Sequence, residues 1–183
     1  MQPGHPLFPC ASVAESDLQQ LNALDREAFV ARLGAIYEHS PWVAQGAWPG
    51  RPFGSLDALH AVMHGVVLSA SRDAQLALIR AHPELQGKVA QPAGLTEASR
   101  SEQTGAGLDR LMPEQHAKLQ TLNRAYRERF GFPFVVAVRG LDAARIIARI
   151  ESRLANTPEQ EFHACLDEIG RIARFRLERL VVT

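Results

Sequence analysis

The sequence predicts an all-α protein, a single-domain helical bundle with one short extended segment near residues 132–138. Apolar residues recur at helical spacing through most of the chain. Residues that typically cap helix N-termini precede most of these periodic stretches. The exception is the run FPFVVAV, which is apolar and β-branched and could be a buried strand or an extended segment. A length of 183 residues is typical of one domain with a substantial core.

Helical periodicity and capping residues predict the elements of the N-terminal half. Asp25 can cap a first helix that ends near residue 40, with an apolar face made of Phe29, Leu33, Ile36 and Tyr37. Glycine and proline indicate a loop over residues 40–55. Ser55 can cap the next helix, and a third, short helix is expected over residues 72–81.

The second half is expected to begin with a loop over residues 82–95, which contains two prolines and two glycines. Thr96 can cap a helix that runs to about residue 109. Proline in the first turn and glycine after the end predict a long helix over residues 113–130. Two further helices are expected to begin at Asp142 and at a capping box, Thr157–Gln160, with the last helix reaching about residue 180.

Composition excludes several classes of function. Lysine plus arginine and aspartate plus glutamate both number 20, so charge gives no support for binding nucleic acid or an anionic membrane. The two cysteines form no CxxC pair, and no apolar stretch is long enough to suggest a membrane span. Without a secretory signal pattern, a cytoplasmic protein is predicted. We expect a poorly ordered N-terminal segment over residues 1–17 and one domain over residues 18–183.

Two histidines, His60 and His64, are spaced so that both lie on one helix face and could suit a metal ion. Ala61 breaks the zinc-protease pattern HExxH, and the spacing alone is common beside an apolar stripe. No metal site is therefore predicted.

Arg176 falls inside the apolar arc of the last predicted helix, where a charge is costly unless it is paired. The arc consists of Phe162, Leu166, Ile169, Ile172, Ala173, Leu177 and Leu180. A structural ion pair and a clamp for an anionic or carbonyl-rich ligand are both compatible with this position.

A second polar group lies on the helix that Thr96 can cap. Ser99, Glu102 and Gln103 share one face, which could orient a polar ligand or simply face solvent. His82 stands where Pro83 ends the preceding helix. It could be a helix-terminating residue, or a proton-transfer group held at a pocket.

Five motifs occur in order and together point to a family: YEHSPWVA (37–44), AHPEL (81–85), LTEASRSEQTGAGL (95–108), FGFPFVVAV (130–138) and ARFRLERL (173–180). Over residues 18–180 the chain resembles the OHCU decarboxylases. These enzymes act on 2-oxo-4-hydroxy-4-carboxy-5-ureidoimidazoline (OHCU) in the pathway from uric acid to allantoin.

The resemblance implies an all-α homodimer that uses no metal or organic cofactor. It places the catalytic histidine at His82 and the catalytic glutamate at Glu102. We hypothesise that His82 is the proton-transfer residue and that Glu102 sets its charge state and orientation. The substrate-contacting positions that the resemblance implies are Pro83, Ser99, Arg100, Ser101, Glu102, Gln103, Arg176 and the backbone of Phe134, Val135, Val136, Ala137 and Val138.

Two alternatives stay open at this point. A helical enzyme of the same fold could act on another ureide. A non-catalytic ligand-binding module would instead have Arg176 paired internally, with His82 and Glu102 far apart.

Overall fold

The computed structural model describes residues 12–85 and 96–182, with side chains over 17–85 and 96–180. Its longest element is α9 (Pro158–Val182), a helix of 25 residues. Five shorter α-helices precede residue 86: α1 (Ser12–Ala23), α2 (Arg26–Leu33), α3 (Pro41–Ala47), α4 (Leu56–Leu68) and α5 (Arg72–Ala81). Three more lie between residue 95 and α9: α6 (Glu97–Gly105), α7 (Pro113–Phe130) and α8 (Ala143–Arg153). Short 3₁₀ helices span Trp48–Gly50 and Leu108–Arg110.

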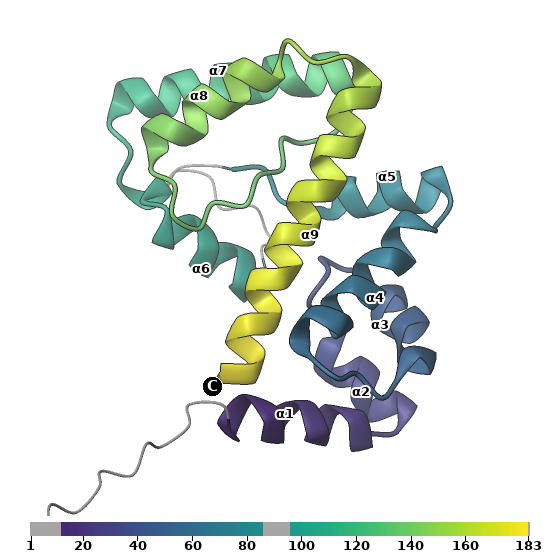
Figure 1. Cartoon of the computed structure of the whole chain (residues 1–183). Helices are drawn as coiled ribbons and strands as arrows, with labels where there is room; N and C mark the ends of the chain where they lie inside the picture. The colour runs from purple at the N-terminus through teal and green to yellow at the C-terminus, as the bar shows by residue number, and fades with distance from the viewer. Residues whose placement is uncertain (1–11, 86–95, 183) are drawn as a thin grey trace, which may run out of the picture.

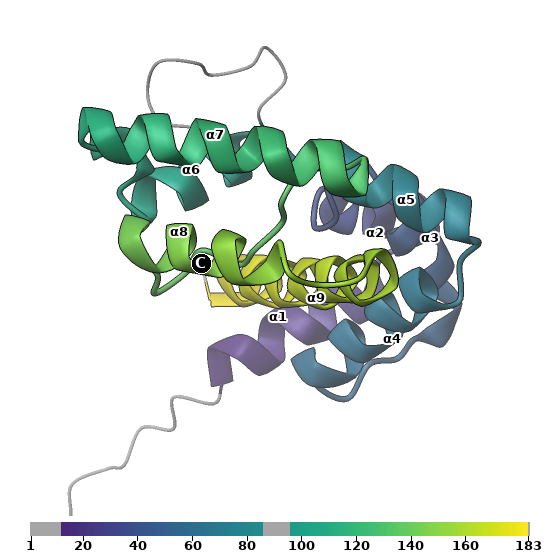
Figure 2. The ribbon, with the colours of Figure 1, turned by 90° about the horizontal axis from the view of Figure 1, so that it is seen from above.

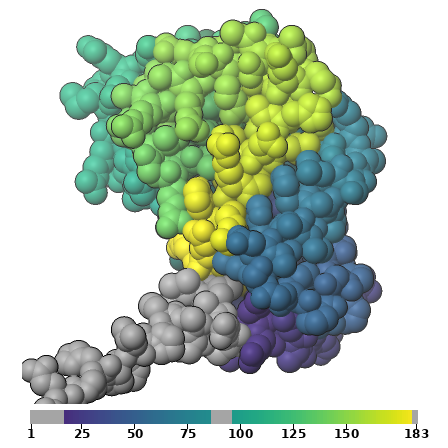
Figure 3. Space-filling model, in the orientation of Figure 1, coloured from purple at the N-terminus to yellow at the C-terminus, as the bar shows by residue number. Residues whose placement is uncertain are grey.

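α9 is the central element of the fold. Helices α2–α5 lie on one side of it and α6–α8 on the other, while α1 crosses near its C-terminal end (Figures 1 and 2). In the space-filling view, the yellow surface of α9 separates the blue and green groups (Figure 3). Because both groups pack on the same helix, their side chains form one continuous apolar core. The all-α prediction is confirmed, and no part of residues 12–85 and 96–182 forms a strand.

The predicted N-terminal caps are confirmed. The side chains of Asp25, Ser55, Thr96 and Asp142 each accept a hydrogen bond from the backbone amide three residues further along. At the start of α9, the Thr157 hydroxyl and the Gln160 side chain exchange hydrogen bonds with each other's backbone amides, which is the predicted capping box. Each cap contributes about 1 kcal/mol to the stability of its helix.

Three predicted elements differ from the structure in their bounds. The expected loop over residues 40–55 contains α3 and a 3₁₀ turn, because Pro41 occupies the first turn of a helix, where proline is tolerated. The helix capped by Asp25 ends at Leu33 rather than near residue 40, yet Ile36 and Tyr37 are buried as predicted. The helix capped by Thr96 ends at Gly105, four residues early, and continues as a 3₁₀ turn.

The run over residues 132–138 is a non-helical connection between α7 and α8 that is not part of a strand. It is buried almost throughout, against the core. The predicted loop over residues 82–95 is described only up to Leu85, and the rest lies outside the described residues. Of the predicted N-terminal segment, residues 1–11 lie outside them too, and its expected end at residue 17 falls inside α1. None of the helices within residues 12–85 and 96–182 could span a membrane.

Candidate active site

A small cavity opens between α6, α9, the connection over residues 132–138 and the residues that follow α5. Its lining consists of His82, Pro83, Leu85, Ser99, Glu102, Gln103, Phe134, Val135, Val136, Val138, Ile172 and Arg176. His82, Glu102 and Arg176 come from three separate elements and meet in this one cavity. The non-catalytic alternative expected His82 and Glu102 to lie far apart, whereas both line this cavity. Its other expectation, an internally paired Arg176, agrees with the structure.

His82 enters the cavity because α5 ends just before it. Its backbone is extended (φ −71°, ψ 134°), the conformation that a following proline favours. The ring is buried, and its Nδ1 lies 2.9 Å from the carbonyl oxygen of Leu78, one turn earlier in α5. A carbonyl oxygen can only accept, so Nδ1 carries the proton. The orientation that we expected Glu102 to impose therefore comes from the helix that His82 terminates.

The environment of His82 favours its neutral form. Burial lowers the pKa of His82 to about 4, and the positive charge of Arg176 acts in the same direction. The hydrogen bond to Leu78 and the charge of Glu38 oppose this shift without reversing it. At neutral pH the imidazole is thus uncharged, with a proton on Nδ1 and a lone pair on Nε2. Such a ring can accept a proton from a ligand.

Arg176 is buried, as its place in the apolar arc predicted, and every N–H group of its guanidinium is engaged. Nε and Nη2 donate to the two carboxylate oxygens of Glu102, at 2.8 and 3.0 Å. Nη1 donates to Glu38 at 2.8 Å and to the carbonyl oxygen of Ile36 at 3.3 Å. Nη2 also donates to the Ser99 hydroxyl at 3.1 Å. Five contacts account for the five donors of an arginine, so the side chain is both internally paired and part of the cavity wall.

Glu38 is the charged residue of this site that sequence reasoning missed. Its carboxylate is buried and accepts hydrogen bonds from Thr96 at 2.7 Å and Ser99 at 3.0 Å, in addition to Arg176. Burial alone would raise the pKa of Glu38, but the Thr96 hydrogen bond and the charge of Arg176 outweigh it and lower the pKa. The only signal in the sequence is its position within the motif YEHSPWVA, directly after the buried Tyr37.

The polar face of α6 points at the cavity as predicted, with Ser99, Glu102 and Gln103 all in its lining. The Gln103 amide also donates to the carbonyl oxygen of Glu84 at 3.3 Å, which links α6 to the segment after His82. This contact limits how far the two walls can separate.

Three residues expected to contact substrate lie outside the cavity lining: Arg100, Ser101 and Ala137. Arg100 and Ser101 are exposed, because they lie one and two residues after Ser99 and so point away from the face that Ser99 shares with Glu102 and Gln103. Ser101 and Ala137 instead line an adjacent hollow of about 780 Å³. Conversely, the cavity includes Leu85 and Ile172, which the sequence did not indicate.

His60 and His64 do share one helix face, and their rings stack with centroids 5.9 Å apart. Nε2 of His60 lies 2.8 Å from the carbonyl oxygen of Gly170 in α9, so this nitrogen donates to the backbone rather than to a metal. Within residues 12–85 and 96–182, no three side chains of His, Cys, Asp or Glu form a group that could hold a metal ion.

Comparison of the sequence with known proteins finds one family along most of the chain. The family model described as OHCU decarboxylase matches residues 22–178. A 2-oxo-4-hydroxy-4-carboxy-5-ureidoimidazoline decarboxylase of Haloferax volcanii is 47% identical over 163 residues, covering 89% of this chain and 95% of the relative. A uric acid degradation bifunctional protein of a Bacillus species is 41% identical, and this chain spans 32% of its length.

Solved structures share the fold. A crystal structure of (S)-allantoin synthase aligns with a TM-score of 0.71 at 29% identity, covering 89% of this chain and 53% of that one. A crystal structure of OHCU decarboxylase in the presence of (S)-allantoin aligns with a TM-score of 0.65 at 19% identity, covering 87% of this chain and all of that one. At that identity the second likeness shows the fold alone.

Proposed function

Because the chain belongs to the OHCU decarboxylase family, we propose that it converts OHCU to (S)-allantoin and CO₂ in uric acid degradation, acting as a carboxy-lyase. The observation that carries this proposal is the convergence of His82, Glu102 and Arg176 on one cavity. The cavity also has the mixed polar and apolar lining of a small-molecule site.

The reaction needs an acceptor for the electron pair of the breaking bond. When the bond from ring carbon C4 to its carboxylate breaks, its electrons form a C4=C5 bond. The electrons of the ring C=N move onto nitrogen, which takes up one proton. The C4 hydroxyl then becomes a carbonyl as its proton leaves, and C5 gains a proton on one face. No step needs an electron sink other than the substrate's own C=N.

His82 suits the transfer of that hydroxyl proton. Its Nε2 carries a lone pair, because Nδ1–H is held by Leu78 and the pKa lies near 4. We propose that Nε2 takes the proton of the C4 hydroxyl and delivers it to one face of C5, which would yield the (S) form. In that role kcat/KM should rise with pH through about 4 and stay level across neutral pH. A decline of kcat/KM above pH 4 would show that His82 acts in its protonated form.

The acidic and basic residues of the cavity have distinct proposed roles. Arg176 fixes both oxygens of Glu102, whose remaining lone pairs can accept hydrogen bonds from the N–H groups of the ring or ureido chain. A direct contact between Arg176 and substrate, which the resemblance implied, stays a prediction and requires one of its five hydrogen bonds to be given up. Gln103 lines the cavity, and its proposed role is to contact a substrate oxygen. Such fixed groups contribute orientation before the bond breaks.

The assay for this function generates OHCU freshly with uricase and hydroxyisourate hydrolase and follows the circular dichroism of allantoin. Addition of the protein should accelerate the appearance of optically active allantoin above the spontaneous rate. Decay at the spontaneous rate would overturn the assignment, and a panel of other ureides would test the alternative substrate.

A histidine variant separates the role of His82 from the overall activity. His82→Gln should fold, and its kcat/KM should fall by about 100-fold or more, the contribution typical of a proton-transfer group. His163→Gln, at an exposed position of α9, is the matched control and should keep full activity. A folded His82→Gln protein with the wild-type rate would remove His82 from the mechanism.

We further propose that the enzyme acts as a homodimer in the cytoplasm. The support is the resemblance to the family, together with a formal net charge of zero, which gives no case for a nucleic acid or an anionic membrane as partner. Analytical ultracentrifugation tests the dimer, and a single species at 20.1 kDa would refute it.

A further inference from the structure

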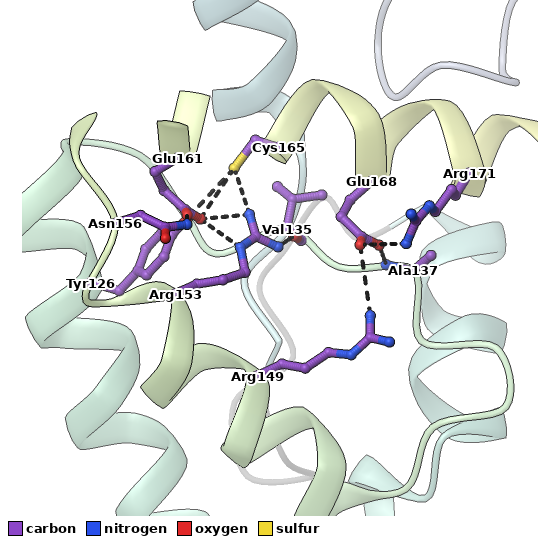
Figure 4. A network of polar contacts seen from close by, with 10 residues as sticks. All are labelled: Tyr126, Val135, Ala137, Arg149, Arg153, Asn156, Glu161, Cys165, Glu168 and Arg171. Atoms are coloured by element: carbon purple, nitrogen blue, oxygen red, sulfur yellow. Dashed lines mark hydrogen bonds and ion pairs between the residues drawn. The ribbon is translucent and has the colours of Figure 1, made fainter. Parts of the chain in front are cut away.

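Figure 4 shows two carboxylates of α9 that are buried beside arginines. Glu161 is fully buried and forms an ion pair with Arg153 of α8 (Figure 4). Glu168 is buried as well and contacts both Arg149 and Arg171 (Figure 4). At each of these carboxylates, the number of arginine partners equals or exceeds the number of acids.

The cluster around Arg176 has the opposite balance, because two carboxylates share one guanidinium. Arg176 is buried and pairs with Glu102 through Nε and Nη2 and with Glu38 through Nη1. The Glu102 side chain is 23% exposed and lines the cavity, whereas Glu38 is buried and does not line it. A buried carboxylate is costly unless hydrogen bonds compensate it, and the partners of Glu38 show what this one holds in place.

Glu38 closes a ring of hydrogen bonds at the outer end of the Arg176 side chain. Nη1 of Arg176 donates to Oε2 of Glu38 at 2.8 Å, and Nη2 donates to the Ser99 hydroxyl at 3.1 Å. The Ser99 hydroxyl in turn donates to the same Oε2 of Glu38 at 3.0 Å. Both terminal nitrogens of the guanidinium are thereby tied to one carboxylate oxygen, one directly and the other through a hydroxyl. This ring fixes how the planar guanidinium is turned about the end of its stem.

The other oxygen of Glu38 anchors the start of α6. Thr96, the N-terminal cap of α6, donates to Oε1 of Glu38 at 2.7 Å. Ser99 lies in the first turn of the same helix. Glu38 itself comes from the segment between α2 and α3. A single carboxylate therefore connects the start of α6 to the arginine of α9.

The orientation of Arg176 decides where the Glu102 carboxylate lies. Nε and Nη2 donate to its two oxygens at 2.8 and 3.0 Å, and such a bidentate contact fixes the carboxylate relative to the guanidinium. A glutamate on a helix has several staggered rotamers, and this contact selects one of them. A turn of the guanidinium would therefore move both oxygens of a residue that lines the cavity.

We propose that Glu38 is a positioning residue, which holds the guanidinium of Arg176 in the orientation that presents the Glu102 carboxylate to the substrate. Because Glu38 does not line the cavity, it acts through its neighbours and makes no contact with the substrate. In this role Arg176 supports Glu102 from behind while it keeps all five of its hydrogen bonds. This inference rests on the proposed function and adds to it a residue outside the cavity.

Two variants separate the position of Glu38 from its charge. Glu38→Asp keeps the charge but withdraws the carboxylate by about 1.5 Å, so it cannot reach Thr96, Ser99 and Arg176 together. We expect its kcat/KM to fall by about 10-fold to 100-fold. Glu38→Gln removes the charge but keeps an oxygen for Arg176 and Ser99, while its amide can donate to the Thr96 hydroxyl. Its kcat/KM should stay within about fivefold of wild type. Glu27→Asp and Glu27→Gln, at an exposed position of α2, are the matched controls.

A double-mutant cycle tests whether Glu38 acts through Glu102. Glu102→Gln alone should lower kcat/KM. Adding Glu38→Asp should lower it further by no more than about threefold, because the group that Glu38 positions is already altered. If Glu38 only stabilised the fold, the two effects would multiply instead. The rates are compared at a temperature at which far-ultraviolet circular dichroism shows every variant to be folded.

Nuclear magnetic resonance of isotope-labelled protein reports on Arg176 without turnover. When the two terminal nitrogens of an arginine have different, fixed acceptors, rotation about the Nε–Cζ bond is slow and the nitrogens give separate signals. We expect separate Nη1 and Nη2 signals for Arg176 in wild type and in Glu38→Gln, and one averaged signal in Glu38→Asp. The exposed Arg100 provides an averaged signal for reference in the same spectra.

The outcomes separate the two proposals. A wild-type protein without decarboxylase activity would overturn the proposed function. An active wild type with Glu38→Asp equally active, with the larger loss in Glu38→Gln, or with multiplying effects in the cycle would overturn only the positioning role. If Glu38→Asp does not fold, the other two measurements decide. Separate Arg176 signals in wild type and an active Glu38→Gln would support the role, whereas averaged signals or a Glu38→Gln loss of more than about 10-fold would overturn it.

Discussion

Acidification should destabilise this fold through His82, at a pH where most carboxylates are still ionised. The buried imidazole has a pKa of about 4, against 6.5 in an unfolded chain. Between these values the unfolded chain binds a proton that the folded protein resists. The contribution of His82 to stability is therefore fully present above pH 6.5 and is lost as the pH falls from 6.5 to 4.

The size of the effect follows from the shift. A difference between 6.5 and about 4 corresponds to roughly 3 kcal/mol over the whole interval. Between pH 7 and pH 5 the expected loss is roughly 2 kcal/mol. The folded protein lowers the pKa of Glu38, so the contribution of Glu38 to stability is also lost on acidification. That loss occurs only below 4.5, the pKa of this carboxyl in an unfolded chain. The two groups thus act in different pH ranges.

Urea denaturation followed by far-ultraviolet circular dichroism measures this directly, with wild type and His82→Gln compared at pH 7 and pH 5. Wild type should lose roughly 2 kcal/mol more than the variant between these conditions. The absolute stability of His82→Gln is irrelevant, because only its change with pH enters the comparison. Parallel pH dependences of the two proteins would show that His82 is not held neutral by burial, and the proposed lone pair on Nε2 would lose its support.

Three further predictions concern one buried ion pair and two helical glycines. Arg176→Met leaves the carboxylate of Glu38 buried without its cation. It should lower the free energy of unfolding by about 3–5 kcal/mol in the same denaturation assay. A loss below about 1 kcal/mol would mean that the other hydrogen bonds of Glu38 stabilise its buried charge without the arginine. Gly170→Ala puts a Cβ 2.7 Å from Cε1 of His64 and should lower the melting temperature, with relief when His64→Ala is added. Gly65→Ala, with nothing within 4 Å of the new Cβ, should instead stabilise α4 by about 1 kcal/mol.

Local signals were enough to place most helices. A capping side chain acts on an amide three residues away, so Asp25 or Asp142 marks a helix start whatever the rest of the fold does. The same holds for the buried position of Arg176, because helical periodicity alone puts it among apolar neighbours. Helix α3 was missed because a proline such as Pro41 can either end one helix or begin another. Local signals do not distinguish these two outcomes, which depend on how the segment packs.

The site depends on contacts between residues far apart in sequence, which periodicity cannot reveal. That Arg176 and Glu102 would line one cavity followed from family resemblance, but their ion pair was not predicted. Glu38, which also pairs with Arg176, lies 138 residues away from it and has no local pattern to identify it. The exclusion of Arg100 from the cavity could have been foreseen, because it lies next to Ser99 on a helix whose inward face was already assigned.

Three polar residues of α9 bind side chains or backbone of other elements and so restrict how its length can vary. Glu161, Glu168 and Arg176 are seven and eight residues apart, about two turns each, so they lie within a sector of about 80° on a continuous helix, roughly 22 Å apart between the outer pair. Deleting or inserting one residue between them would rotate everything beyond by about 100° and point Arg176 away from both of its glutamates. Substitutions on the outer face of α9 should be tolerated freely, whereas length changes there should be rejected in any random library screened for this activity.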